Sequence, residues 1–176
     1  YPLNTVPGQR LKYEQYLDYL RSKGYKITLY PFFSQKAYKI LYLKGMSLAK
    51  SWEVLLGFLR RIFLLFLIPS ADGIYVFLNV VPLGPPLLEW LYLKLAKRTI
   101  YDIDDMVHLL HTSNVNRLSQ RFKTKYRYFL IMKEASHVIT CTPTLDNIVR
   151  KYNRNTTDIS STINTEDYVS VNSYTN

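Results

Sequence analysis

The sequence has a single cysteine, Cys141, in 176 residues, so a disulfide within the chain is excluded and a reducing compartment is indicated. Acidic residues are also few: 13 Asp and Glu stand against 23 Lys and Arg, a formal net charge of +10. This charge favours an anionic partner, such as a phospholipid surface, a phosphorylated substrate or nucleic acid. Long apolar runs are lacking too. Arg60 and Arg61 interrupt the most hydrophobic stretch, VLLGFLRRIFLLFLIP. Its uninterrupted apolar part is shorter than the roughly 18 to 20 residues that a membrane-spanning helix needs.

Apolar and aromatic residues are plentiful, at 48% and 15% of the chain, and include 16 tyrosines. This content excludes wholesale disorder and is enough for one domain with a buried core. The chain opens with Tyr1 rather than Met, and no basic and apolar leader follows it. We therefore expect a piece of a longer gene product that carries no signal peptide.

Strand and helix patterns alternate regularly after Pro69. Buried strands are expected at residues 72–81, 98–105, 137–142 and 156–163, and helices between them at 85–97, 113–135 and 144–152. Earlier in the chain we expect a helix at 11–20 that stops at Gly24, a strand at 27–30, and a mostly helical region at 34–68 that breaks near Gly45. The pattern predicts an α/β, Rossmann-like three-layer domain with a mainly parallel sheet over residues 1–168, followed by a linker or tail at 169–176.

Ligands of open parallel sheets bind at the carboxyl ends of the strands, so the loops at these ends are the candidate sites. Three loops qualify, namely TVPGQR at 5–10, NVVPLGPP at 79–86 and DIDDMVH at 102–108. The first of them should follow a strand that would lie before Tyr1, so the first strand of the domain is expected to be missing from this sequence.

Three carboxylates follow the strand that ends near Tyr101. The D-x-D spacing of Asp102 and Asp104 is similar to the nucleophile and acid of haloacid-dehalogenase phosphatases, although Met106 departs from that pattern. The same pair could hold a metal, as in metal-dependent single-domain glycosyltransferases, but no third ligand is identifiable. Asp104 and Asp105 could also simply complement the dipole at a helix N-terminus.

Two histidines and the cysteine are further candidates for a metal ligand or a nucleophile. His108 and His111 lie three residues apart, but no cysteine or third histidine stands at a zinc-ligand spacing, which favours ordinary cleft or surface histidines. No histidine is placed to activate Cys141, so we expect a small buried residue there. These residues therefore indicate no zinc site, and no cofactor is expected.

Four stretches of the chain, taken in order, resemble one family. PGQRLKYEQYLDYLRSKGYKITLYPFF resembles the first helix and second strand of the retaining glycosyltransferases of family four, which have the two-domain GT-B fold. PLGPPLLEWLYLKLAKRTIYDIDD is similar to a stretch in their bacterial surface-polysaccharide branch. ASHVITCTPTLDNIVRKYN and ISSTINTEDY resemble the last helix and strand units of that branch before the crossover to the second domain. The resemblance covers residues 7–168.

The resemblance implies the N-terminal, acceptor-binding half of an enzyme for capsule, O-antigen or exopolysaccharide synthesis. Such an enzyme moves a sugar from a nucleotide-sugar donor to a glycan or lipid-linked acceptor, with retained configuration and without a metal or a covalent intermediate. In the family a C-terminal domain holds most of the nucleotide sugar. The isolated chain would then lack turnover.

The first loop supplies three of the residues that the resemblance assigns to substrate binding. Gly8 matches the glycine of that loop, whose missing side chain lets backbone approach the donor phosphates and the acceptor. Gln9 and Arg10 follow at the helix start, where amide groups and a guanidinium favour an anion.

The other expected site residues lie in the later loops. Asp104 and Asp105 match an acidic pair at the cleft, and we expect them to be catalytic by orienting the acceptor hydroxyl or accepting its proton. Asn79 and His108 are expected substrate contacts, although Asn79 and Val80 stand where the family pattern suggests a charged residue. Asp102 is expected to be structural.

Family acceptors are often carried on lipid diphosphates, which implies a cytoplasmic protein, peripheral on the inner face of the membrane. The region 36–61 interleaves six cations with apolar residues and could lie on anionic lipid, each cation contributing on the order of 1 kcal/mol. Alternatively, Leu55, Leu56, Leu59 and Ile62 are ordinary core positions with a solvated basic back. No nucleic-acid-binding motif accompanies the charge. The alternative function is a non-catalytic α/β module that binds a phosphorylated glycolipid or a membrane surface.

Overall fold

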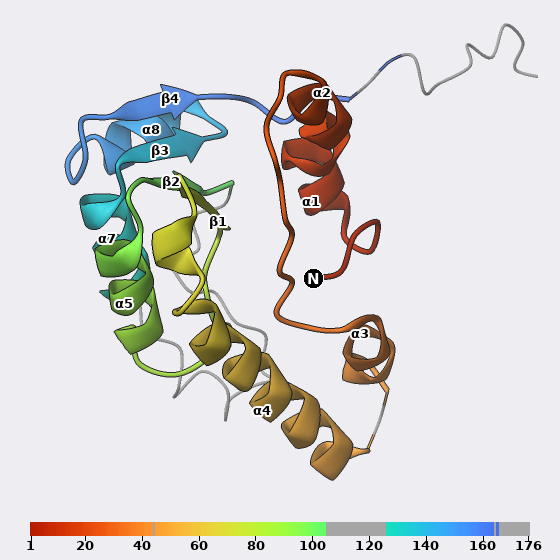
Figure 1. Cartoon of the computed structure of the whole chain (residues 1–176). Coiled ribbons are helices and arrows are strands. Elements are labelled where there is room, and N and C mark those ends of the chain that lie inside the picture. The colour runs from red at the N-terminus through yellow and green to blue at the C-terminus, as the bar shows by residue number, and fades with distance from the viewer. Residues whose placement is uncertain (44, 105–125, 164, 166–176) are drawn as a thin grey trace, which may run out of the picture. The chain divides into compact units, whose positions relative to one another are not determined.

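The computed structural model describes residues 1–43, 45–104, 126–163 and 165 (Figure 1). The chain divides into two compact units, which are described separately. Unit 1 comprises residues 1–2 and 31–160, and unit 2 comprises residues 3–30 and 161–176.

Unit 1 is built on a four-stranded parallel sheet. Its strands are β1 (Ile74–Phe77), β2 (Thr99–Asp102), β3 (His137–Thr140) and β4 (Thr156–Asp158), in the order β1-β2-β3-β4. The first three strands are rich in β-branched and aromatic residues, which suit a pleated, half-buried surface. The α/β class with a parallel sheet flanked by helices, consistent with a Rossmann-like three-layer domain, is thus confirmed.

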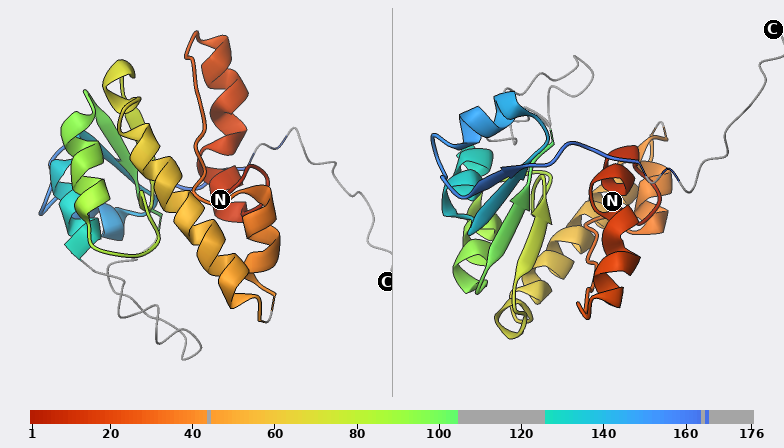
Figure 2. Two further views of the ribbon diagram at one scale, coloured as in Figure 1. Left: turned by 60° about the horizontal axis from the view of Figure 1, so that its bottom comes forward. Right: turned by 90° about the horizontal axis from the view of Figure 1, so that it is seen from above.

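Three helices join successive strands, namely α5 (Leu87–Leu95), α7 (Tyr126–Glu134) and α8 (Pro143–Val149). Crossovers between neighbouring parallel strands are right-handed, so a sheet whose strand order follows the chain carries all three helices on one face. The right-hand view of Figure 2 shows α5, α7 and α8 together on one side of the sheet. The aligned residues Val76, Tyr101 and Val138 are buried in the core of unit 1.

The predicted helical region before the sheet is confirmed. It consists of α3 (Gln35–Leu41), α4 (Ser47–Leu64) and the short 3-10 helix η2 (Ile68–Ser70), with the break at Gly45, whose φ is +73°. The hydroxyl of Ser34 caps α3 by accepting a hydrogen bond from the backbone N–H of Ala37 at 3.0 Å. The buried ring of Phe32 packs edge-on against Phe33 and Phe58, with ring centroids 4.9 and 5.4 Å away.

Unit 2 contains α1 (Pro7–Lys12), the 3-10 helix η1 (Glu14–Tyr16) and α2 (Leu17–Ser22). The single helix expected at 11–20 is therefore wrong, because Tyr13 leaves the helical region with φ −137° and ψ −28°. The side-chain amide of Gln15 donates to the carbonyls of Leu11 at 2.7 Å and Thr162 at 2.8 Å, so it ties the chain near residue 162 to the helical segment.

Several expected strands differ from the structure, and the one expected at 156–163 ends at Asp158. Residues 27–30 form no strand, since no strand among the described residues pairs with them, and a strand is stable only beside a hydrogen-bonded neighbour. The strand expected at 72–81 ends at Phe77, where the backbone turns. The last part of the helix expected at 113–135 is α7, and its first part lies outside the described residues.

The tight contact beneath Phe32 leads to a stability prediction. A Cβ on the buried Gly57 of α4 would lie 2.6 Å from the Phe32 ring, which Phe33 and Phe58 hold in place. Gly57→Ala is therefore expected to lower the free energy of unfolding by about 1 to 3 kcal/mol, although Ala favours helix. Urea unfolding measures the change. Ser51→Ala, at an exposed position of the same helix, is the control and should leave stability within about 0.5 kcal/mol. A Gly57→Ala protein as stable as the control would contradict this packing.

Candidate functional site

The carboxyl ends of β1, β2 and β3 lie side by side at one edge of the sheet. Phe77 is aligned with Asp102, and Asp102 with Ile139, so the residues that follow each strand emerge at the same level. This edge is where open parallel sheets bind ligands. We refer to it as the carboxyl edge.

A strained turn follows β1 at the carboxyl edge. Leu78 has a φ of +63°, and the N–H of Asn79 donates to the carbonyl of Phe77 at 2.8 Å, which is the hydrogen bond of a γ-turn. A positive φ at a non-glycine residue costs on the order of 1 to 3 kcal/mol and persists only where the surroundings impose it. Here the Leu78 N–H donates to the Asp102 carbonyl and the Tyr101 hydroxyl donates to the Leu78 carbonyl, both at 2.9 Å. β2 thus holds the turn from both sides.

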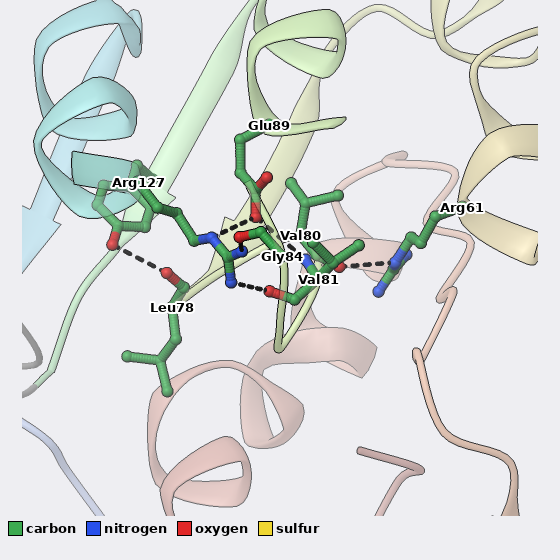
Figure 3. Close-up of polar contacts among 8 residues, drawn as sticks. Arg61, Leu78, Val80, Val81, Gly84, Glu89 and Arg127 are labelled. Carbon is green, nitrogen blue, oxygen red and sulfur yellow. Dashed lines mark hydrogen bonds and ion pairs between the residues drawn. The ribbon is translucent and has the colours of Figure 1, made fainter. Parts of the chain in front are cut away.

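A buried ion pair holds the loop that continues from this turn. Arg127 on α7 and Glu89 on α5 face each other at 3.0 Å from Nε to Oε1, and their side chains are 2% and 0% exposed. Figure 3 shows the guanidinium also donating to the carbonyls of Val81 and Gly84. Glu89 Oε1 in turn accepts from the N–H of Val81 at 3.3 Å. The backbone of the loop is therefore clamped between two crossover helices.

The end of α4 is tied to the same loop. Arg61 donates from Nε to the carbonyl of Val80 at 2.9 Å (Figure 3). The hydroxyl of Tyr92 on α5 donates to the carbonyl of Arg61 at 2.9 Å. Val80 and Val81 themselves are buried in the core. The loop is thus anchored through both its side chains and its carbonyls.

Burial raises the pKa of three side chains near the loop, those of Glu89, Tyr101 and Tyr128. Burial raises the pKa of Glu89, and the positive charge of Arg127 opposes that rise without cancelling it. Burial also raises the pKa of Tyr101 well above its ordinary value, so its hydroxyl keeps the proton that it donates to Leu78. The pKa of Tyr128 is raised by burial as well, against the opposing effects of Arg127 and a hydrogen bond with the Asn79 side chain.

The two described carboxylates at the end of β2 differ in exposure. Asp102 is 2% exposed and accepts a hydrogen bond from the hydroxyl of Tyr75 on β1. Asp104, two residues further, is half-buried, and its carbonyl accepts from the thiol of Cys141 at 2.6 Å. Asp104 is therefore the more accessible of these two acids.

Only some of the predicted site residues lie together in the structure. Asn79 and Asp104 follow neighbouring strands and both belong to the carboxyl edge. Asp105 and His108 lie outside the described residues.

The three residues predicted in the first loop belong to unit 2. Gly8 lies inside helix α1 rather than in a loop before it, because Pro7 begins the helix, so the loop expected at 5–10 is wrong from Pro7 onward. Gln9 is buried and donates from Nε2 to Oε1 of Glu14 at 3.0 Å. Arg10 is exposed.

Sequence reasoning missed the pair that shapes the site. Glu89 is the only acid in the apolar run LLEWLYL, and an acid among apolar helix positions signals a buried charge that needs a partner. Arg127 gave no comparable signal, because it stands among other cations in KTKYRY. Only the fold shows that these two side chains meet.

The chemistry available at the carboxyl edge is hydrogen bonding on a rigid backbone. The Asn79 amide can donate and accept, and an ionised Asp104 carboxylate accepts, which suits hydroxyl-bearing ligands. Among the residues that the structure describes, no three His, Cys, Asp or Glu side chains gather into a group that could hold a metal ion.

In comparisons with known proteins, no family model matches the chain, and no curated protein or solved structure matches it either. The resemblance to family-four glycosyltransferases therefore stays a prediction.

The clamp predicts a large effect on stability. Arg127→Met is expected to lower the free energy of unfolding by about 3 to 5 kcal/mol, because it leaves Glu89 as a buried charge without its partner. Urea unfolding measures the loss. Glu89→Leu combined with Arg127→Met should recover only part of it, since the unpaired charge is removed but the N–H of Val81 and the carbonyls of Val81 and Gly84 still lack their side-chain partners. An Arg127→Met protein with wild-type stability would show that the ion pair does not hold the loop.

A pH dependence follows from the same pair. The pKa of Glu89 already lies above its ordinary 4.5, and loss of Arg127 removes the charge that opposes the rise. From pH 4.5 up to the folded-state pKa, the folded state keeps a proton that the unfolded state releases, so stability falls as pH rises through this window. Unfolding of Arg127→Met followed from acid to neutral pH should show this fall. Glu89→Gln in the same background should abolish it, and a fall that persists would assign it to another group.

Proposed function

We propose that this chain is the acceptor-binding half of a glycosyltransferase that moves a sugar from a nucleotide-sugar donor to a glycan or lipid-linked acceptor. The observation that carries the proposal is the carboxyl edge. Asn79 and Asp104 follow neighbouring parallel strands there, and the Arg127–Glu89 pair clamps the loop that begins at Asn79. The four sequence stretches that resemble family-four glycosyltransferases support the same assignment.

In the proposed reaction, the main task of this half of the enzyme is to hold the acceptor hydroxyl in place. The acceptor oxygen forms a bond to the anomeric carbon of the donor sugar, the bond from that carbon to the diphosphate breaks, and the hydroxyl proton must leave. A carboxylate within hydrogen-bond reach orients the hydroxyl and can accept its proton. Asp104 takes this role in the proposal, and Asn79 contacts a neighbouring hydroxyl of the acceptor.

The donor is assigned to a different part of the enzyme. By resemblance, a second Rossmann-like domain would hold the nucleotide diphosphate, and this chain would close the acceptor side. A clamped backbone suits that role, because it loses little conformational entropy when an acceptor binds.

A substitution of Asp104 tests the catalytic role. In the full-length protein, Asp104→Asn should lower kcat by about 10²- to 10⁴-fold, because the amide cannot accept the hydroxyl proton. Release of nucleoside diphosphate from the donor measures the rate. Asp72→Asn is the matched control, since it makes the same change at an exposed residue before the amino end of β1. Activity of Asp104→Asn near that of the control would remove Asp104 from the mechanism.

The non-catalytic alternative makes an opposite prediction. The full-length protein, offered UDP-, GDP- and dTDP-sugars with a lipid extract as the acceptor source, should consume one of them if the proposal holds. Consumption of none, by protein that is folded by circular dichroism, would favour a module that only binds.

A further inference from the structure

Helix α4 has one buried face and one exposed face that is apolar. Its inner face carries the buried residues Glu53, Gly57 and Leu64 and packs in the core of unit 1. Its outer face carries large side chains at intervals of three or four residues, which puts them on one side of the helix. These residues form what we call the outer α4 stripe: Leu48, Trp52, Leu55, Leu59, Ile62 and Phe63.

The outer α4 stripe is exposed to solvent. Leu48 is 87% and Trp52 58% exposed, and the other four members are each about half exposed or more. The sequence also allowed an interpretation in which Leu55, Leu59 and Ile62 are core positions. Their exposure shows that this interpretation is wrong. The chain that leads into α4 adds Tyr42 and Met46, which are exposed as well. A continuous apolar surface of this kind marks an interaction site.

The segment that contains the stripe carries a net positive charge. Residues 35–68 contain six cations and a single acid, Glu53. Glu53 is buried and accepts a hydrogen bond from the hydroxyl of Ser34 at 3.2 Å, so it does not offset the surface charge. Lys36, Lys39 and Arg60 are exposed. The segment thus combines apolar side chains with uncompensated positive charge.

This combination identifies the partner class. A second copy of the chain seated on the same face would bring cations against cations, which opposes association. A nucleic acid would match the cations but would leave the apolar stripe in water. An anionic lipid surface matches both, because headgroups attract Lys and Arg while the acyl boundary takes up Leu, Phe and Trp.

We propose that the outer α4 stripe is a membrane-docking surface that lies in the headgroup region of a bilayer containing anionic lipid. None of the described helices combines the length and hydropathy needed to cross a bilayer, so α4 would lie in the plane of the surface. This inference does not rest on sugar transfer, because a lipid-binding module without activity would use the same surface.

The two tryptophans of the chain, Trp52 and Trp90, give a residue-specific test. Trp90→Phe leaves Trp52 as the only tryptophan, and its emission should shift to the blue when vesicles containing phosphatidylglycerol are added. Trp52→Phe leaves Trp90, on α5, and its emission should not shift. An unchanged Trp52 emission, or an equal shift of both, would overturn the proposal.

Matched substitutions distinguish membrane binding through the outer α4 stripe from nonspecific hydrophobic binding. Leu48→Ser with Trp52→Ser should lower the partition coefficient onto anionic vesicles by at least about tenfold. Leu87→Ser with Trp90→Ser is the control, since it makes the same changes at residues of α5 that are 59% and 44% exposed. Co-sedimentation measures binding, and circular dichroism confirms that both variants fold. Equal loss in the two variants would contradict a specific stripe.

The lipid and salt dependence tests the electrostatic part. Lys36→Gln with Lys39→Gln should weaken binding to anionic vesicles about tenfold and have little effect on vesicles of phosphatidylcholine alone. Added salt should weaken wild-type binding in the same direction. A protein that instead ignores vesicles and forms a dimer that Leu48→Ser with Trp52→Ser dissociates would assign the stripe to self-association and overturn the proposal.

Discussion

The ion pair between Arg127 and Glu89 is the contact on which the carboxyl edge depends. Both charges are shut away from water, so each needs the other, and together they bind the loop through the N–H and carbonyl of Val81 and the carbonyl of Gly84. That loop begins at the strained turn of Leu78. The pair therefore fixes this backbone in one place, and it does so from two different helices.

The same arrangement connects the edge to α4. Arg61 comes from that helix and binds the carbonyl of Val80, and Tyr92 binds the carbonyl of Arg61. The inner side of α4 is thus part of the support for the loop, while its outer side presents apolar and basic groups to the surroundings. In the proposals made above, one rigid helix would join the surface on which the protein rests to the edge at which an acceptor binds.

Much of the fold could be predicted from the sequence, because strand and helix patterns are local. The runs IYVF, TIYD and HVIT form β1, β2 and β3 where the pattern expected them, and the helices between them follow. The local pattern was misleading at 27–30, because a strand also needs a hydrogen-bonded partner strand, which a local pattern does not show. The place of Asn79 and Asp104 at the carboxyl edge could be predicted because both follow predicted strands. Arg127 and Glu89 were not, because 38 positions separate them and only tertiary packing brings them together. The γ-turn at Leu78 also left no signal, since no glycine marks it.

The strand order of unit 1 has a consequence for how the protein is made. Because β1, β2, β3 and β4 are neighbours in the sheet in the order of synthesis, each new strand can add to an edge already present as it leaves the ribosome. The carboxyl edge does not share this progression. Glu89 emerges early with its carboxylate lacking a partner, and the loop gains its clamp only when Arg127 follows. Since Arg127 precedes β3 and β4 in the chain, the loop can be clamped while half of the sheet is still to be added.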